Sequence, residues 1–340
     1  MKTKNLQYYV SAFLTTYLGG ERGLSENTSI SYNKAFQLLI PYLCDKTGKP
    51  INKIAMDDFS AENIKSFLAF LETSGKSVAT RNQRLAAIKS FCRFVLQDDP
   101  QYMYSLQEIL NLKAKKHNTT PLVYLSSDQL SWLLKEPDYT NRYGFKDLLI
   151  LTILSDTGVR VSEFINIHVS DVRLEAPAQI LIHGKGGKTR WVPISSKAAE
   201  LLKLYMDKEG LLNVIQQERL LFVNRSGSKF TRAGITYILK KYVAMVHNKH
   251  PLDFPEKLSP HCLRHTKAMM MLEMNQNLIY IRDILGHEHM KTTEIYARTD
   301  GKQIRNAVEA VSFSIPAVNA DRIDYQGNSE LLAWLVDYCK

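Results

Sequence analysis

Apolar residues recur at helical spacing through most of residues 1–111. After Ser25, for example, Tyr32, Phe36 and Leu39 fall three or four positions apart. That spacing places them on one face of a helix. The segments 60–77 and 77–97 repeat the pattern. We therefore expect an all-helical N-terminal domain over residues 1–111.

The composition changes abruptly in LKAKKHNTTPLVYLSSDQL (112–130), which turns to Lys, Asn, Thr and Pro. Such a stretch is typical of a linker between domains. Ser126 or Ser127 is suited to cap the helix that follows it. We therefore expect a linker over 112–125 and a second domain over 126–300.

The second domain mixes helices with a short sheet. GFKDLLILTILSDTG (144–158) is almost entirely apolar and predicts a buried helix. AQILIHGKGGKTRWVPIS (178–195) alternates apolar and polar residues around a glycine-rich turn, which predicts a β-hairpin. Helical patterns return afterwards, and the tail 301–340 ends in a short amphipathic helix. The fold class predicted is mainly α with a small β-sheet.

The charge indicates a polyanionic partner, nucleic acid first. The chain carries a net charge of +10, with 16 basic and 10 acidic residues in 1–118 (+6), 24 and 19 in 119–300 (+5), and 4 and 5 in 301–340 (−1). Two consecutive basic blocks fit two DNA-facing lobes. Six basic residues on predicted helices are either phosphate contacts or ordinary solvated positions. They are Arg81, Arg84, Lys89, Arg232, Lys240 and Lys241, of which the last three follow a helix cap predicted at Thr231.

The cysteines and the N-terminus indicate a protein of the cytoplasm. The four cysteines are far apart and show no CxxC pair, so a disulfide framework or a structural zinc site is not expected. The first residues lack the continuous apolar core of a signal peptide. No apolar run approaches the roughly 18–20 residues that span a bilayer. We expect no membrane partner.

Four short segments concentrate residues that bind or transfer phosphoryl groups, although each has an ordinary explanation alone. Arg160 could simply pair with Glu163 three positions later. A lysine in a hairpin turn is usually solvated, histidines near helix starts are often structural, and the chain has 17 tyrosines. The residues in question are Arg160 and Glu163 in TGVRVSE, Lys185 in HGKGGKTR, His261 and Arg264 in PHCLRH, and His287 and Tyr296 in LGHEHMKTTEIYAR.

Taken together, these residues support metal-free transesterification of a phosphodiester. The guanidinium forks of Arg160 and Arg264 suit non-bridging phosphate oxygens. A histidine can donate to those oxygens or move a proton, and a tyrosine can attack phosphorus and conserve the bond energy. A lysine in a mobile turn can protonate the leaving oxygen. No acidic cluster able to hold a metal accompanies them, so no metal and no cofactor is expected.

The four segments resemble the motifs of the tyrosine recombinase family, which includes the lambda-integrase and Xer types. The resemblance is in residue type, order and spacing throughout 126–300, and is weaker in the N-terminal helices. It implies a catalytic set in this chain with Glu163 in a supporting role and Tyr296 as nucleophile. The set is Arg160, Lys185, His261, Arg264, His287 and Tyr296.

The resemblance further implies two domains, a helical core-binding domain and a mixed α/β catalytic domain, which together would clamp duplex DNA. Tyr296 would form a 3′-phosphotyrosyl link, and four protomers would pair two recombination sites through a Holliday junction without ATP. The tail 301–340 would dock on a neighbouring protomer or pack on its own domain. We expect a bacterial-type, nucleoid-associated enzyme, aided by accessory or directionality proteins. The length after Tyr296 and the absence of an added arm-binding domain favour a mobile-element integrase or transposase.

Two other functions fit the same residues. One is a DNA-binding regulator on this fold without catalysis, although every catalytic position is filled. The other is a type IB topoisomerase, which uses the same chemistry on one duplex. Outside the catalytic set, we predict that His265 and His289 are structural and that the Thr292–Thr293 pair caps the helix that presents Tyr296.

Overall fold

The computed structural model describes residues 5–21, 26–116, 122–288 and 290–299. The predicted tail over 301–340, its terminal helix and His289 lie outside the described residues. The chain divides into two compact units, an N-terminal unit of residues 1–121 and a C-terminal unit of residues 122–340. Each is described by itself.

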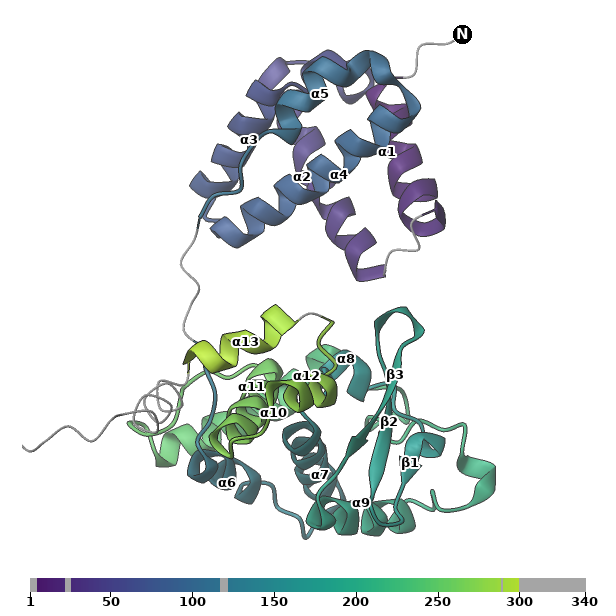
Figure 1. The fold of residues 1–340 in the computed structure, drawn as a ribbon, viewed down its shortest axis with the longest axis vertical. Coiled ribbons are helices and arrows are strands. Elements are labelled where there is room, and N and C mark those ends of the chain that lie inside the picture. Colours follow the sequence, from purple (N-terminus) through teal and green to yellow (C-terminus); the bar gives the residue numbers. More distant parts are fainter. Residues whose placement is uncertain (1–4, 22–25, 117–121, 289, 300–340) are drawn as a thin grey trace, which may run out of the picture. The chain divides into compact units, whose positions relative to one another are not determined.

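The N-terminal unit is helical throughout its described part (Figure 1). A π-helical stretch, Phe13–Glu21, continues directly from its first helix. The helices are α1 (Leu6–Ala12), α2 (Glu26–Thr47), α3 (Ala61–Thr73), α4 (Val78–Asp98) and α5 (Met103–Leu110).

Aromatic rings fill the centre of the N-terminal unit. The ring of Phe91 on α4 meets those of Phe13, Phe36 and Phe59 edge-on, at centroid distances of 5.4, 5.1 and 5.2 Å. Edge-to-face pairs at this spacing add to the stabilisation that comes from burial. The apolar spacing that predicted these helices therefore corresponds to the face that each turns to the core.

The C-terminal unit places a small sheet on one side of a set of helices (Figure 1). In chain order its elements are α6 (Ser127–Lys135), α7 (Arg142–Thr157), α8 (Val161–Phe164), β1 (Val172–Arg173), β2 (Gln179–His183), β3 (Thr189–Pro193), α9 (Ser196–Lys208), α10 (Arg232–Lys249), α11 (Pro260–Glu273), α12 (Leu278–Leu285) and α13 (Met290–Thr299).

The predicted β-hairpin is present. The sheet order is β1-β2-β3, and β2 and β3 pair antiparallel with Ile180 opposite Val192. Both of these side chains are fully buried, because alternate residues of a strand point to one face. The turn Lys185–Gly187 joins the strands, and Gly186 and Gly187 have φ angles of 72° and 74°, which favour glycine. The hairpin therefore carries Lys185 at its tip.

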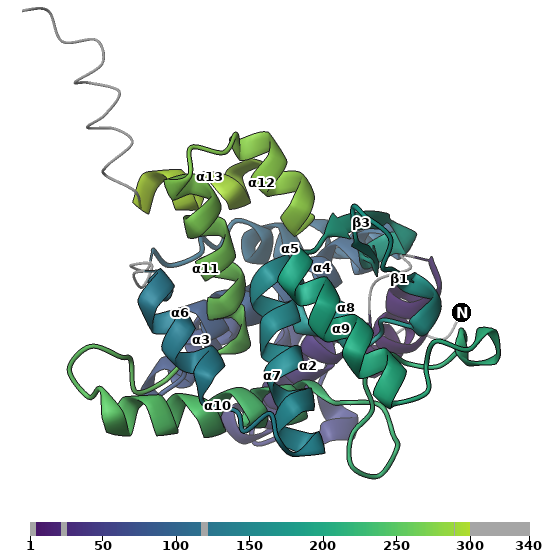
Figure 2. The ribbon, with the colours of Figure 1, turned by 90° about the horizontal axis from the view of Figure 1, so that it is seen from below.

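Helix α7 is the buried centre of the unit, as its apolar sequence predicted. It packs against α9 on one side and α11 on the other (Figures 1 and 2). It ends at Gly158, whose left-handed φ of 62° is a common helix terminator. The turn at Gly158 leads directly to Arg160 and α8.

Side-chain caps fix the starts of two helices where the sequence predicted them. The Ser126 hydroxyl accepts from the backbone N–H of Gln129 at the start of α6, and that of Thr231 accepts from Gly234 at the start of α10. The prediction of a mainly helical chain with a small sheet is confirmed. Among the described helices, none is long and apolar enough to cross a membrane.

Candidate active site

A buried carboxylate joins two arginines from different elements. Glu163 on α8 is 7% exposed and accepts from Arg160 Nη1 at 2.9 Å and from Arg190 Nη2 at 2.8 Å. Burial tends to raise the pKa of this carboxyl, but the bonds from Arg190 and Arg160 outweigh it and hold the pKa below its usual value. Glu163 therefore stays ionised and orients both guanidinium groups.

The same two arginines reach the turn between α12 and α13. Arg190 Nε donates to the Ile284 carbonyl at 3.0 Å, and Arg160 donates to the Gly286 carbonyl at 3.3 Å. Gly286 has a φ of 67°, and a Cβ on it would lie 2.5 Å from Arg190 Nη1. Glycine is required here both by its backbone conformation and by this close approach. The hairpin strand β3 and the turn before His287 are thus held together by Arg190, which sequence reasoning did not assign.

We expect Glu163→Gln to lower the free energy of unfolding of the C-terminal unit by about 2–3 kcal/mol. The substitution leaves two adjacent cations without their shared buried carboxylate, and the partial exposure of Arg160 reduces the penalty. Urea unfolding followed by tryptophan fluorescence measures it, since all three tryptophans lie in 122–340. Glu288→Gln, which removes an exposed pair with Lys188 at 3.5 Å, is the matched control and should cost under about 0.5 kcal/mol.

Arg264 on α11 is buried at 1% exposure, yet it is incompletely bonded. Its Nη1 donates to the Gly158 carbonyl at 2.9 Å, whereas Nε and Nη2 have no hydrogen-bond acceptor among the described residues. Burial and then the charge of Arg160 lower the pKa of Arg264 to about 10, so it remains a cation at neutral pH. Burying a cation whose donors have no acceptor costs free energy unless an anion binds to it. Arg264 is built to receive an anion.

His287 follows the Gly286 turn and is buried against α13. Its Nδ1 lies 2.8 Å from the Thr293 hydroxyl. The helix begins at Met290, so Thr293 lies inside α13. The prediction that the Thr292–Thr293 pair caps this helix is therefore wrong, because the helix starts earlier and Thr293 turns inward to His287.

We expect His287 to make the C-terminal unit less stable in mild acid. Burial, then the charges of Arg264 and Arg160, lower the pKa of His287 to about 3. The unfolded chain, with a histidine pKa near 6.5, therefore takes up the proton first, and stability falls as the pH drops below about 6.5. Between pH 7.5 and 5 the wild type should lose about 2 kcal/mol more than His287→Gln. Urea unfolding at the two pH values measures these losses. If the wild type and His287→Gln lost the same free energy of unfolding, the prediction would be contradicted.

Tyr296 lies on α13 with its ring in a small apolar cluster that includes Ala268, Met269 and Leu272. Only 2% of the residue is exposed, and its ring lies parallel to that of His287 at 6.2 Å. Burial raises the pKa of the hydroxyl above its usual value, and the charges of Arg264 and Arg160 offset only part of this. The phenol is therefore protonated at neutral pH, with two arginine side chains near it.

The Tyr296 hydroxyl also lies 3.0 Å from Nδ1 of His265. Sequence reasoning treated His265 as a structural residue and missed this contact. One signal was available: His265 follows His261 by four positions, so both lie on the same face of α11. The two rings meet edge-on at 4.3 Å.

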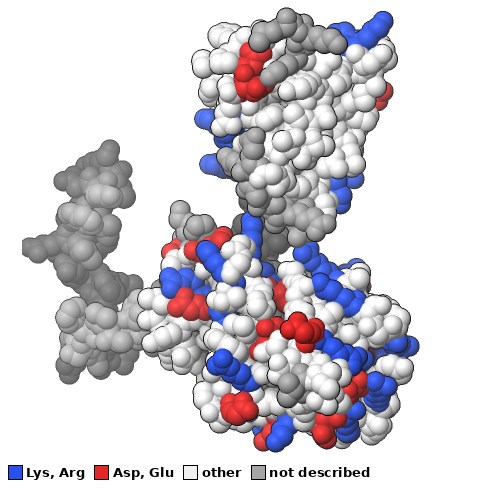
Figure 3. All heavy atoms as spheres, turned by 90° about the vertical axis from the view of Figure 1, so that its right-hand side faces the viewer, with Lys and Arg blue, Asp and Glu red and all other residues white. Residues whose placement is uncertain are grey.

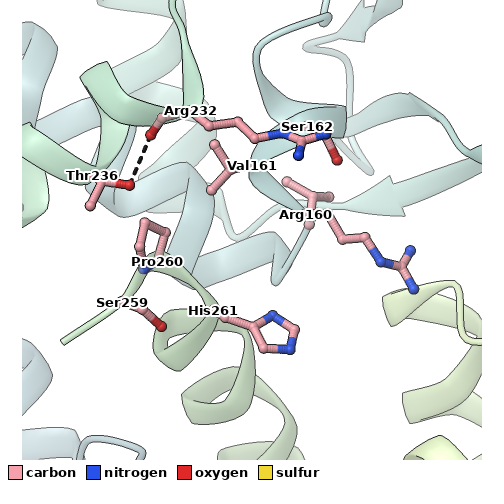
Figure 4. A pocket seen from close by; sticks show the side chains of 9 residues that line it. Arg160, Val161, Ser162, Arg232, Thr236, Ser259, Pro260 and His261 are labelled. Atoms are coloured by element: carbon pink, nitrogen blue, oxygen red, sulfur yellow. Dashed lines mark hydrogen bonds between the residues drawn. The ribbon is translucent and has the colours of Figure 1, made fainter. Parts of the chain in front are cut away.

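An open pocket of about 370 Å³ lies beside this cluster and is lined by Arg160, His261 and Arg232. In Figure 4 the side chains of Arg160 and His261 extend to the same side, and Arg160 donates to the Gly286 carbonyl. Arg232, from the start of α10, extends across the pocket toward Ser162 (Figure 4). The pocket joins one predicted DNA-contacting residue to two of the predicted catalytic set.

Three of the predicted lysines are not brought to this pocket. Lys185 is exposed at the tip of the hairpin. Lys240 and Lys241 lie on α10 about 12–14 Å along the axis from Arg232, at 1.5 Å per residue. Lys241 donates to the Tyr242 hydroxyl at 3.0 Å and lies 3.7 Å from Asp147. Lys241 thus already has partners within its own unit.

Of the predicted N-terminal DNA contacts, two have internal partners. Arg81 Nε lies 2.9 Å from a Glu72 oxygen, and Arg84 donates to the Ser31 carbonyl at 3.0 Å. Lys89 lies on the same helix, α4, and is partly buried. On the face of the C-terminal unit seen in Figure 3, basic and acidic side chains are interspersed. That face therefore offers single basic residues for phosphate contacts and no uniform basic patch.

Family models match both units of the chain. Residues 123–303 match the phage integrase family, and residues 11–98 match the phage integrase N-terminal SAM-like domain. The chain therefore belongs to the phage integrase family. Its enzyme class is that of the tyrosine site-specific recombinases, as the curated relatives indicate.

Three of these relatives match most of the chain. Tyrosine recombinase XerD of Oceanobacillus iheyensis is 30% identical over 90% of this chain and 98% of its own length. Tyrosine recombinase XerC of Bacillus subtilis is 28% identical over 89% of this chain and 95% of its own length. A putative integrase/recombinase of Sinorhizobium fredii is 29% identical, over 87% and 88%.

Solved structures agree with this fold. The XerH site-specific recombinase, bound to its difH substrate before cleavage, matches with a TM-score of 0.63 and 25% identity, over 88% of this chain and 84% of that one. The Tn1549 transposon integrase in complex with transposon right end DNA matches with a TM-score of 0.68 at 17% identity, over 90% and 98%. The match to the Tn1549 integrase, at 17% identity, shows a shared fold.

Proposed function

We propose that this recombinase cuts and rejoins duplex DNA at specific sites by transesterification, with Tyr296 as the nucleophile. The observation that supports it best is the convergence of Arg160, Arg264, His287 and Tyr296 around the turn at Gly286. These side chains come from four separate segments, and structural needs alone do not explain a buried arginine with two unused donors.

In this mechanism the scissile phosphate supplies the hydrogen-bond acceptors that Arg264 lacks. The free Nε and Nη2 donors of Arg264 bind its non-bridging oxygens, and Arg160, held by Glu163, binds from the pocket side. Both charges stabilise the pentavalent transition state in which the Tyr296 oxygen attacks phosphorus. His261 and His287 donate to the same oxygens, and Lys185 at the hairpin tip protonates the leaving 5′ oxygen. The product is a 3′-phosphotyrosyl link and a free 5′ hydroxyl.

Strand exchange then needs a partner site. A 5′ hydroxyl from the partner strand attacks the phosphotyrosyl link, so the number of phosphodiester bonds is conserved and no ATP is required. Four protomers pair two recombination sites and pass through a Holliday junction. Both units bind the duplex, with Lys89 and Arg232 as phosphate contacts and Arg81, Arg84, Lys240 and Lys241 as further candidates.

The biological role that we propose is integration or excision of a mobile element, on the bacterial nucleoid and with accessory or directionality proteins. The Sinorhizobium relative, described as a putative integrase/recombinase, supports this role. A second role, the resolution of chromosome or plasmid multimers, would use the same chemistry. The position of the recombination site in the genome distinguishes the two roles.

The test is to capture covalent complexes of the purified wild-type protein with genomic DNA fragments and to sequence the DNA that is attached. We expect a small set of related sites joined through a 3′ phosphate. Sites at the ends of a mobile element support integration, whereas one site in each copy of a replicated circle supports resolution. Relaxation of plasmids that lack any captured site would identify a topoisomerase instead. Sequence-specific binding without any covalent complex would identify a non-catalytic regulator.

A further inference from the structure

The nucleophile needs a proton acceptor inside the protein. Tyr296 is 2% exposed, and burial raises the pKa of its hydroxyl above the usual value. Bulk water therefore has little access to the phenol, and the phenolate is not available in advance. A neighbouring side chain has to take the proton as the oxygen–phosphorus bond forms.

His265 is placed to be that acceptor. Its Nδ1 lies 3.0 Å from the Tyr296 oxygen, within hydrogen-bond reach, and its ring meets the tyrosine ring edge-on at 5.6 Å. With the ring proton on Nε2, Nδ1 accepts the phenol proton. Helix α11 holds His265 one residue after Arg264, so the acceptor and the phosphate-binding guanidinium share one rigid support.

The other groups near the phenol are less suited to this task. Arg264 and Arg160 only donate hydrogen bonds. His287 faces the Tyr296 ring, and its Nδ1 is bonded to Thr293 at 2.8 Å. His261 lies at the pocket edge, in edge-on contact with His265. Among the described residues, His265 is the one with a nitrogen that can accept a proton at bonding distance from the Tyr296 oxygen.

We propose that His265 is the general base of DNA cleavage, a further catalytic residue that accepts the phenol proton of Tyr296. This proposal rests on the proposed function. In the step, the Tyr296 O–H bond breaks and its proton passes to Nδ1 of His265. The phenol oxygen bonds to phosphorus, the bond to the 5′ oxygen breaks, and that oxygen takes a proton from Lys185. Re-ligation reverses the step, and His265 returns the proton to the tyrosine.

The substrate itself increases the basicity of this histidine. In the structure, burial, the neighbouring His261 and the charge of Arg264 lower the pKa of His265 to about 4. The ring is therefore neutral and able to accept at neutral pH. A bound phosphodiester brings a negative charge to Arg264 and so cancels part of the charge that disfavours protonated His265.

Two substitutions separate proton transfer from positioning. Asparagine at 265 offers a carbonyl oxygen near the place of Nδ1, so it accepts the hydrogen bond but does not take the proton, whereas alanine does neither. The measurement is the single-turnover rate of covalent complex formation on a nicked substrate, with DNA affinity and thermal unfolding of each variant as checks. We expect both His265→Asn and His265→Ala to be slower than wild type by roughly 100-fold or more.

A second substrate tests the direction of the proton. When sulfur replaces the bridging 5′ oxygen, the leaving group no longer needs an acid. The cleavage rate of Lys185→Ala should therefore return toward that of the wild type, while His265→Asn should still cleave slowly. The proposal is overturned if His265→Asn cleaves at the wild-type rate, if His265→Ala does so, or if sulfur restores His265→Asn. A wild-type protein that forms no covalent complex with any genomic DNA fragment would instead refute the proposed function.

Discussion

Replacing Tyr296 with phenylalanine is expected to abolish covalent attachment to DNA. Phenylalanine keeps the ring that packs with Ala268, Met269 and Leu272, so the fold and the DNA affinity should be retained. It removes the oxygen that attacks phosphorus, and without that oxygen no phosphotyrosyl link can form. The loss should be complete within the detection limit of a denaturing gel on a nicked substrate.

The control for this variant is Tyr280→Phe. Tyr280 lies on α12 and is 62% exposed, so removal of its hydroxyl should leave cleavage unchanged. A covalent complex that survives in Tyr296→Phe would show that another residue is the nucleophile. Loss of DNA binding in the same variant would instead point to a defect in folding.

The second large effect is expected at Arg264, where activity and stability should change in opposite directions. Arg264→Met removes the guanidinium that completes the phosphate site, and we expect cleavage to slow by at least about 10³-fold. The same change removes a buried cation with two unused donors, at the loss of one bond to Gly158. The free energy of unfolding should therefore rise by about 1 kcal/mol.

Single-turnover cleavage and urea unfolding measure these two effects separately. Arg282→Met is a matched control, since Arg282 lies on α12 and pairs with its neighbour Asp283 at 2.7 Å on the surface. It should alter neither quantity appreciably. A large loss of stability in Arg264→Met would mean that Arg264 supports the fold, and that its free donors are not held in reserve for a substrate.

The elements were predictable where local sequence decides them. The hairpin was predicted from alternating apolar residues around a glycine-rich turn, and α7 from its almost entirely apolar sequence. The caps at Ser126 and Thr231 were predicted because an N-cap side chain acts within three residues. The Thr292–Thr293 prediction failed because a contact with His287 six positions earlier competed with local capping.

The candidate site was predictable as a set of residue types but not as a set of contacts. Arg190 is an ordinary strand residue in sequence, and its bond to the Ile284 carbonyl joins positions 94 apart. His265 stands 31 positions before Tyr296, and only the packing of α13 on α11 brings the two together. Contacts of this separation depend on the tertiary fold, which spacing along the chain does not reveal.

The close approach of Arg190 to Gly286 has a consequence for the history of the chain. Because a Cβ at position 286 would lie 2.5 Å from Arg190 Nη1, a larger residue there would displace the Arg190 guanidinium from its bonds to Glu163 and to the Ile284 carbonyl. Among related sequences, we expect a larger residue at position 286 to occur together with a shorter side chain at position 190. These two sites should therefore covary, and a hairpin exchanged between recombinases should function best when the turn before the histidine is exchanged with it.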